Sequence, residues 1–272
     1  MKRYDLPTEI IEVTVDQLNS NGQGVAFYTH APDRGSMGKR LTLFIHNTVP
    51  GDVVRVTVPN AKGRRRARID EFELLKPSPD RNLENPIKET IAGGTPLQYM
   101  KYDAQLKYKE NLVKSYLTEE NFDISLVQPI IGLEEPNNYR NKMEFTFGPD
   151  GSIGMHEQGN FKNIIDLEDS IIAPKIMIEI KKVVSKWQKE HQLTGYDKEA
   201  KIGLLRQLMI RKSFAIDEIM VVIVATKASE SLESATKDLI LRLTKHFHEI
   251  KSLLWIESDN QGDQFVADKV TL

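Results

Sequence analysis

Cysteine is missing from this 272-residue sequence. Its absence excludes disulfide bonds, metal sites built from thiolates and a cysteine nucleophile within the chain. The sequence also has no run of about 18 apolar residues, so it predicts no transmembrane helix. The first residues, Met1 to Pro7, carry no apolar core of a signal peptide. We therefore expect a cytoplasmic location and no membrane partner.

A large excess of charge of either sign is missing too. The 37 lysines and arginines nearly balance the 39 aspartates and glutamates, which gives a formal net charge of −2 at pH 7. This balance excludes a uniformly basic surface. It allows a local basic cluster, because salt limits the reach of a charge to about 10 Å. The 40% share of hydrophobic residues is enough for a core, and the length allows one large domain or two.

Residues 136–145 combine an aromatic ring, two cations, amides and a carboxylate in the run Pro-Asn-Asn-Tyr-Arg-Asn-Lys-Met-Glu-Phe. Apolar and polar residues alternate from Met143 onward, which predicts a strand, and the turn at 148–151 lets residues 152–156 return as a hairpin. Cations at a rigid strand entrance suit phosphate, and an exposed tyrosine suits base stacking. The alternative is an ordinary charged strand entrance whose tyrosine covers the core.

The first part of the chain, residues 1–76, predicts a small all-β domain. Apolar and polar residues alternate in short runs, separated by turn sequences such as Asn21-Gly22. Five short strands with tight turns favour a small, partly closed barrel of the oligonucleotide-binding type. The expected strands are Glu9–Leu18, Gly24–Tyr28, Leu41–His46, Asp52–Pro59 and Arg66–Leu74.

Four arginines lie within five positions where the last expected strand begins. A cluster of like charges is unfavourable without an anionic partner, and RNA phosphate is the partner that a barrel of this type favours. The alternative is a solvated turn with scattered charge. The cluster consists of Arg64, Arg65, Arg66 and Arg68.

Residues 77–100 begin with two prolines and predict a linker, and residues 101–272 predict a second domain. Helices are expected at 101–119, 174–192 and 230–248, and strands at 127–131, 161–166 and 252–257, in addition to the hairpin above. Residues 202–211 and 219–227 are expected to form a second hairpin. These elements predict an α+β domain whose antiparallel sheet is covered by helices. The fold class predicted for the chain is therefore α+β, a barrel followed by this domain.

Several stretches resemble one family. Residues 139–145, followed by the Gly-Ser-Ile-Gly of 151–154, closely resemble the central domain of the RNA uracil-C5 methyltransferases that act on ribosomal and transfer RNA. Residues 204–213 and 220–224 are similar to the same domain. Residues 18–26, 44–45 and 48–54 resemble the TRAM domain, an RNA-binding barrel found at the amino terminus of many of these enzymes. The resemblance covers essentially the whole chain.

One departure concerns the iron–sulfur cluster that cysteines hold in many members of this family. The matching positions here are Asn85, Ala92, Thr95 and Ser170, and none of them supplies a thiolate. The Gly-Gly pair between them is retained. We therefore expect the loop without the cluster.

The resemblance also implies a Rossmann-like domain that binds S-adenosylmethionine and carries a catalytic cysteine. Because the sequence shows no glycine-rich loop after a strand and no cysteine, we expect that domain to be absent, with no cofactor and no catalytic residue in this chain. The expected function is the RNA-binding portion of a 23S rRNA uracil-C5 methyltransferase, truncated or split, so that catalysis needs a separate polypeptide with the methyltransferase domain or an adjacent coding segment. The alternatives are a non-catalytic RNA-binding or ribosome-assembly protein derived from the family, or an unrelated barrel protein of translation.

The expected ligand is therefore ribosomal or transfer RNA. Tyr139 is expected to stack on a base, Asn141 to hydrogen-bond RNA or brace the turn, and the cations to bind phosphates. The candidate RNA contacts are Arg64, Arg65, Arg66, Arg68, Tyr139, Arg140, Asn141, Lys142, Arg206 and Arg211.

Overall fold

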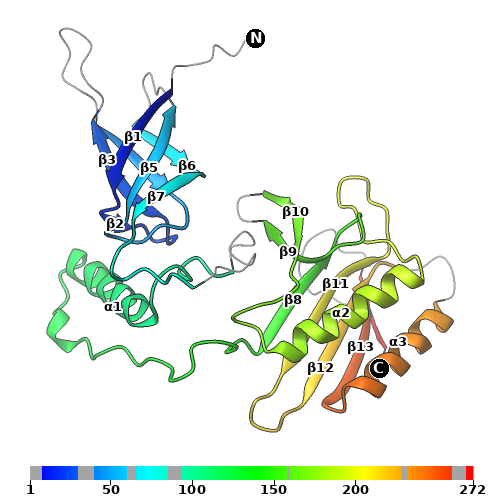
Figure 1. Ribbon diagram of the computed structural model, residues 1–272. Coiled ribbons are helices and arrows are strands. Elements are labelled where there is room, and N and C mark those ends of the chain that lie inside the picture. The colour runs from blue at the N-terminus through cyan, green and yellow to red at the C-terminus, as the bar shows by residue number, and fades with distance from the viewer. Residues whose placement is uncertain are drawn as a thin grey trace. The chain divides into compact units, whose positions relative to one another are not determined.

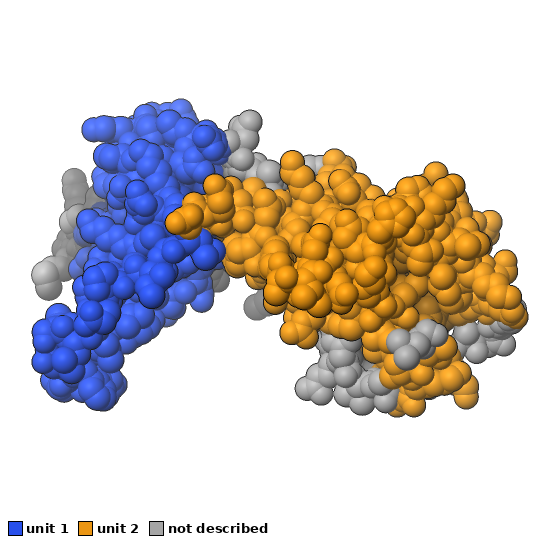
Figure 2. Space-filling view, turned by 90° about the horizontal axis from the view of Figure 1, so that it is seen from below, with its two compact units in different colours: residues 1–86, 96–133 blue, residues 87–95, 134–272 orange. Residues whose placement is uncertain are grey.

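A computed structural model describes residues 8–29, 40–59, 65–84, 94–157, 160–227, 232–258 and 268–271. The chain divides into two compact units, coloured separately in Figure 2. The first unit comprises Met1–Pro86 and Pro96–Leu133, and the second comprises Ile87–Thr95 and Glu134–Leu272. The division differs from the expected boundary, because residues 101–133 belong to the first unit.

The described part of the first unit contains two small sheets (Figure 1). One sheet has the order β1-β5-β7 and the other the order β2-β3-β4-β6. Strands β4 and β6 are parallel, whereas the other neighbouring pairs are antiparallel. The strands are β1 (Thr8–Thr14), β2 (Gln17–Leu18), β3 (Gly24–Thr29), β4 (Arg40–Ile45), β5 (Val53–Pro59), β6 (Arg66–Ile69) and β7 (Phe72–Lys76).

The two sheets share one apolar core. Alternate residues of β4 and β5 point into it, so that Leu41, Leu43 and Ile45 lie beside Val54 and Val56 in a single buried cluster. The alternation that predicted these strands is therefore the alternation that fills the core.

The expectation of five strands in this unit is wrong, because two of the expected strands are each divided. The first expected strand divides where the chain passes from one sheet to the other. The amide of Val15 donates to the carbonyl of Asp52, just before β5, whereas the amide of Asp16 donates to the carbonyl of Val25 in β3. The last divides at residues 70–71, so that β6 pairs with β4 and β7 pairs with β5.

Helix α1 (Tyr102–Glu119) confirms the first predicted helix, although it has no fully buried residue. The residues before it attach to the sheets through a small apolar cluster of Leu18, Val49 and Met100, and the Tyr108 hydroxyl donates to the Asn19 carbonyl over 2.7 Å. The strand predicted at 127–131 is wrong: the chain after the short 3-10 helix η2 (Ile124–Leu126) is irregular. No helix in the described ranges combines the length and apolarity needed to cross a bilayer.

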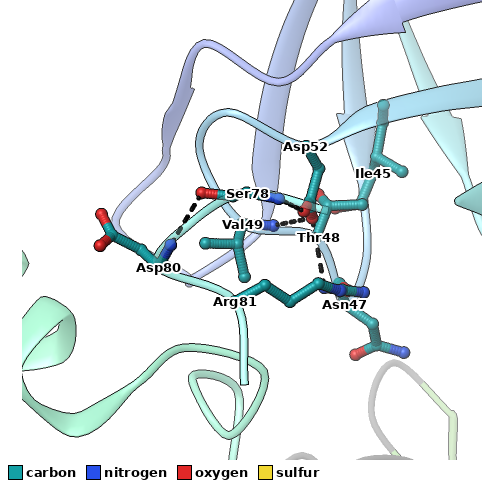
Figure 3. A network of polar contacts seen from close by, with 8 residues as sticks. All are labelled: Ile45, Asn47, Thr48, Val49, Asp52, Ser78, Asp80 and Arg81. Carbon is teal, nitrogen blue, oxygen red and sulfur yellow. Dashed lines mark hydrogen bonds and ion pairs between the residues drawn. The ribbon is translucent and has the colours of Figure 1, made fainter. Parts of the chain in front are cut away.

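A buried polar network fixes the segment that follows β7 (Figure 3). The Asp52 carboxylate accepts hydrogen bonds from the amides of Val49 and Ser78 and pairs with the Arg81 guanidinium at 3.2 Å. Arg81 also donates to the Asn47 carbonyl and lies over the Tyr99 ring. The prolines at 77 and 79 therefore lead into a segment anchored to the sheet.

The second unit is built on one seven-stranded sheet with the order β10-β9-β8-β11-β12-β13-β14. The hairpins predicted for β8–β9 and β11–β12 are confirmed by antiparallel pairing. The elements are β8 (Lys142–Phe147), β9 (Ile153–Glu157), β10 (Asn160–Asp166), α2 (Lys175–Glu190), β11 (Leu205–Lys212), β12 (Ile219–Ala225), α3 (Glu233–His246), β13 (Ile250–Glu257) and β14 (Lys269–Thr271).

The prediction of an antiparallel sheet is wrong, because β12 and β13 are parallel and the sheet is mixed. Helix α3 lies between these strands in the chain and crosses over the sheet, as a parallel pair requires (Figure 1). Helices α2 and α3 pack together on one face, where the indole of the fully buried Trp187 donates to the Ala235 carbonyl. The second surface described below lies at the end of the sheet where β8 begins.

Candidate nucleic-acid interface

The outer face of the sheet β2-β3-β4-β6 gathers aromatic rings and guanidinium groups. Register places Phe27, Thr42 and Arg66 in one row across three strands, and Phe44 beside Arg68 in the next row. Their neighbours along each strand point into the core, so these side chains share the outer face. We call this surface, formed by Phe27, Arg40, Phe44, Arg66 and Arg68, the basic sheet face.

Phe27 and Arg40 are members of this face that the sequence reasoning missed. The Arg40 guanidinium lies 3.9 Å from the centre of the Phe27 ring, and that ring is 38% exposed. The alternation of β3 already placed Phe27 on the opposite side from the core residue Ala26. Phe27 and Arg40 come together because β3 pairs with β4. Spacing along the chain does not predict this pairing.

Two of the predicted arginines, Arg66 and Arg68, lie in strand β6 on this face. Arg65 and Arg66 are exposed, and Arg68 forms a 2.6 Å ion pair with Asp70. Because both side chains of that pair are more than half exposed, the pair is weak and RNA phosphate can compete for Arg68. Arg64 lies outside the described residues.

His46 lies just past the end of β4, close enough to Arg68 for the arginine charge to affect the pKa of His46. Burial lowers the pKa of His46 most, the charge of Arg68 lowers it further, and Asp70 opposes both effects. The Nε2 atom of His46 lies 2.7 Å from Nε2 of Gln23. The ring is therefore neutral at pH 7, and the positive charge of the face comes from arginine.

The second surface lies where β8 begins. The backbone on either side of Tyr139 is fixed, because the amides of Asn138 and Arg140 donate to the carbonyls of Ile171 and Ile172. Tyr139 itself is 50% exposed. At this exposure a base can reach the ring, and the stacking role of Tyr139 stays a prediction.

Ser170, one of the positions matched to a cluster cysteine, supports this same segment. Its hydroxyl oxygen accepts hydrogen bonds from the amides of Ile172 and Ala173, which shapes the turn whose carbonyls hold residues 138 and 140. Thr95 is buried, whereas Asn85 and Ala92 lie outside the described residues. Within the described ranges, no group of three or more histidines, aspartates and glutamates is placed to hold a metal ion.

Register brings two of the predicted cations together at this end of the sheet. Lys142 of β8 lies directly opposite Arg211 of β11, and the amide of Lys212 donates to the Asn141 carbonyl over 2.8 Å. Like charges directly opposite in neighbouring strands are destabilising. Lys142 forms a 2.9 Å ion pair with Glu144, which only partly balances the two charges.

Arg211 and Asn141 line a groove of about 370 Å³ at this end, which we call the end groove. Lys212 and Lys251 add two more cations to its lining, although Lys212 is paired with Asp217. An anion with several oxygen atoms suits such a lining. The complete lining is Asn141, Arg211, Lys212, Ser213, Ile216, Glu218, Ile219, Met220, Lys251 and Ser252.

Arg206 does not join this surface. It occupies an irregularity in the pairing of β11 with β12 and is only 8% exposed. Its guanidinium donates to the Ser258 carbonyl at 3.1 Å and lies 4.9 Å from the centre of the Tyr196 ring. The structure therefore gives Arg206 a packing role instead of an accessible position for phosphate.

Comparison with known proteins finds similarity to RNA methyltransferases. It is 30% identical over 266 residues to an uncharacterized RNA methyltransferase of Halalkalibacterium halodurans, covering 96% of this chain and 55% of that protein. An uncharacterized RNA methyltransferase of Porphyromonas gingivalis is also 30% identical, over 83% of this chain and 53% of its own length. The homologues of this chain are RNA methyltransferases. No family model matches the chain.

A solved structure has the same fold. It is the Pyrococcus abyssi tRNA (uracil-54, C5)-methyltransferase in complex with S-adenosyl-L-homocysteine. The match has a TM-score of 0.68 and 20% sequence identity, and it covers 96% of this chain and 55% of the solved chain. This chain therefore spans about half the length of the relatives that it matches.

These similarities correct three predictions. The expected absence of a Rossmann-like methyltransferase domain, with only amino-terminal and central domains present, is contradicted because a methyltransferase fold matches nearly the whole chain. The expectation of no cofactor is contradicted because that matched fold was solved with S-adenosyl-L-homocysteine. A separate catalytic polypeptide is not supported, because in the homologues the matched segment belongs to one longer chain.

Proposed function

We propose that this chain binds RNA as part of an S-adenosylmethionine-dependent RNA uracil-C5 methyltransferase. The observation that carries the proposal is the direct opposition of Lys142 and Arg211, shortly after the exposed Tyr139 in the chain. Arg211 also lines a groove together with further cations. Two like charges placed side by side on rigid strands are stabilised by an anionic ligand. The proposed reaction is inferred from the reactions named for the relatives and for the matched structure.

The basic sheet face supports the same function independently. It combines the exposed Phe27 ring with guanidinium groups on neighbouring strands. Single-stranded nucleic acids are held by this pairing of aromatic platforms, on which bases stack, with cations that follow the backbone. The two surfaces lie in different compact units, so each can be tested with its own variants.

S-adenosylmethionine would supply the methyl group to the uracil ring. The end groove does not fit this cofactor, because its arginine and lysines would face the positive sulfonium. We therefore assign the groove to phosphate and derive no step of methyl transfer from its residues.

Filter binding across a salt series tests the proposal. A structured fragment of 23S rRNA and a transfer RNA serve as the two probes. The resemblance of the sequence favours ribosomal RNA, and the matched structure is that of a tRNA methyltransferase. Each phosphate contact contributes a slope of about −0.7 to a log–log plot for single strands. An Arg66→Ala/Arg68→Ala double variant and a Lys142→Ala/Arg211→Ala double variant should each flatten the slope by roughly 1.4 units.

Charge-matched controls carry the same number of substitutions elsewhere. Arg55→Ala/Lys76→Ala changes the other sheet of the first unit, and Lys182→Ala/Lys186→Ala changes the exposed side of α2. Both controls should keep the wild-type slope. If all four double variants bind both RNAs with the wild-type slope, neither surface binds phosphate and the proposal fails.

A further inference from the structure

Residues 213–218, which we call the tip turn, join β11 to β12 and carry two exposed apolar side chains beside the end groove. Phe214 is 56% exposed and Ile216 is 66% exposed. Ile216 itself lines the groove, and the Phe214 ring lies 6.0 Å from Nζ of Lys212, which lines the groove as well. Neither apolar side chain has a part in the phosphate contacts proposed above.

Backbone and side-chain contacts both close the tip turn. The amide of Ser213 donates to the Glu218 carbonyl over 2.8 Å, and the Lys212 ammonium pairs with the Asp217 carboxylate. Asp217 has a φ of +51°, in the left-handed region that aspartate adopts more readily than most residues. The strands stay paired up to Lys212 and Ile219, where the turn begins and ends. The two apolar side chains are therefore presented in a fixed position.

The groove next to the tip turn indicates which kind of partner covers these side chains. Apolar side chains that are exposed together, with charged groups around them, mark contact surfaces. The lining of the groove contains the cations Arg211, Lys212 and Lys251 but only one carboxylate, that of Glu218. An anionic partner with flat apolar groups fits this surface best. A nucleic acid combines the two properties, because its bases stack on aromatic rings while cations hold its backbone.

We propose that Phe214 stacks on an unpaired base of RNA whose backbone phosphate lies in the end groove. The ring offers one wall only, since none of the described residues that line the groove is aromatic. A base inside a continuous helical stack has both faces covered, whereas a base in a loop leaves a face free for the ring. Stacking of this kind does not select one base, because every base has a flat aromatic face.

The inference rests on the proposed RNA-binding function and adds the part of the RNA that this surface takes, a single-stranded segment with an accessible base. A protein surface, including a second copy of this chain, is the other partner that an exposed phenylalanine suits. The charge of the groove favours RNA, and the experiment separates the two.

Fluorescence of Phe214→Trp in the full chain tests the contact directly, because stacking on a base quenches an indole. The probes are an RNA hairpin with an unpaired loop and the same hairpin with abasic loop positions, and wild type supplies the background of Trp187 and Trp255. We expect the intact hairpin to quench the added indole and the abasic hairpin to quench it much less. Phe214→Ala should weaken hairpin binding roughly five-fold or more at an unchanged salt slope, because the ring carries no charge.

Phe122 supplies the matched control, because it is 65% exposed and belongs to the first unit. Phe122→Ala should bind the hairpin like wild type, and the emission of Phe122→Trp should not respond to the RNA. Circular dichroism should show that all four variants are folded, since both phenylalanines lie outside the core.

The outcomes separate the stacking inference from the proposed function. If the wild type binds RNA in the salt series while Phe214→Ala binds equally well and the hairpin leaves Phe214→Trp unquenched, the inference is overturned and the proposed function stands. If the wild type binds none of these RNAs, both fail. Analytical ultracentrifugation without RNA covers the remaining case. A dimer that Phe214→Ala abolishes, with RNA binding unchanged, would assign the tip turn to a contact between copies and likewise overturn the inference.

Discussion

Asp52 and Arg81 form an ion pair from which solvent is almost fully excluded. The carboxylate and guanidinium lie 3.2 Å apart, and their side chains are 0% and 6% exposed. The pair joins the turn before β5 to the segment that leaves β7 (Figure 3). Each charge therefore depends on the other, because removing one partner leaves an uncompensated charge in the interior.

Asp52→Asn should destabilise the first unit by about 3–5 kcal/mol, the usual result of breaking a buried pair by removing one partner. Hydrogen exchange followed by mass spectrometry is the appropriate measurement, because it reports each segment separately. Peptides from β4 and β5 should lose protection, whereas peptides from β11 and β12 should keep it.

Glu12→Gln serves as the control for this change. Glu12 pairs with Arg55 at 2.8 Å, but both side chains are more than 40% exposed. Its loss should leave exchange unchanged throughout the chain, since exposed pairs contribute little. Equal protection in Asp52→Asn and wild type would show that the buried pair does not hold the unit together.

His46 should make the first unit sensitive to mild acid. Burial and Arg68 lower its pKa below the ordinary value of 6.5, so below pH 6.5 the unfolded chain binds a proton that the folded chain resists. Its contribution to stability is therefore present above pH 6.5 and declines as the pH falls through that value. Between pH 7.5 and pH 5.5 the free energy of unfolding, measured with urea, should fall more in wild type than in His46→Gln. An equal fall in both proteins would contradict this account.

Tyr139→Ala should weaken RNA binding by about 1–3 kcal/mol while leaving the salt slope unchanged, because a stacked ring contributes no counterion release. Tyr116→Ala is a suitable control, since Tyr116 is similarly exposed but lies on α1. A change of slope in Tyr139→Ala would indicate that the substitution disturbs the neighbouring cations.

Gly203→Ala should destabilise the second unit more than Gly151→Ala. Both glycines have positive φ, of +109° and +84°, so both substitutions introduce backbone strain of about 1–2 kcal/mol. Only at Gly203 does the new Cβ meet the backbone of Gly195, whereas nothing lies within 4 Å at Gly151. Unfolding monitored by tryptophan fluorescence reports this unit, because both tryptophans, Trp187 and Trp255, belong to it.

Local patterns in the sequence predicted the elements well where one face is buried. The alternation at Met143, Phe145 and Phe147 gave β8, and all three side chains are buried. The apolar spacing around Trp187 gave α2, which extends over nearly the predicted range. In both cases the periodicity of the chain itself carries the information.

Pairing between distant segments could not be predicted in the same way. The parallel alignment of β12 and β13 depends on the path of α3, which periodicity does not specify. Lys142 and Arg211 are both visible as cations, yet their opposition follows only from the register of β8 with β11. The inward turn of Arg206 similarly depends on an irregular pairing, so a residue that looked available to RNA is buried.

The order β9-β8-β11 has a consequence for synthesis on the ribosome. Strand β8 emerges with β9 as its only early neighbour, and its other partner follows only after β10, α2 and a further loop have been made. During that interval one edge of β8 is unpaired and its apolar face is uncovered, a state that is prone to association. Fragments that end before and after β11 can be compared for solubility during translation. Slow translation through α2 would prolong the exposed state, so codon choice in this stretch should affect the yield of folded protein.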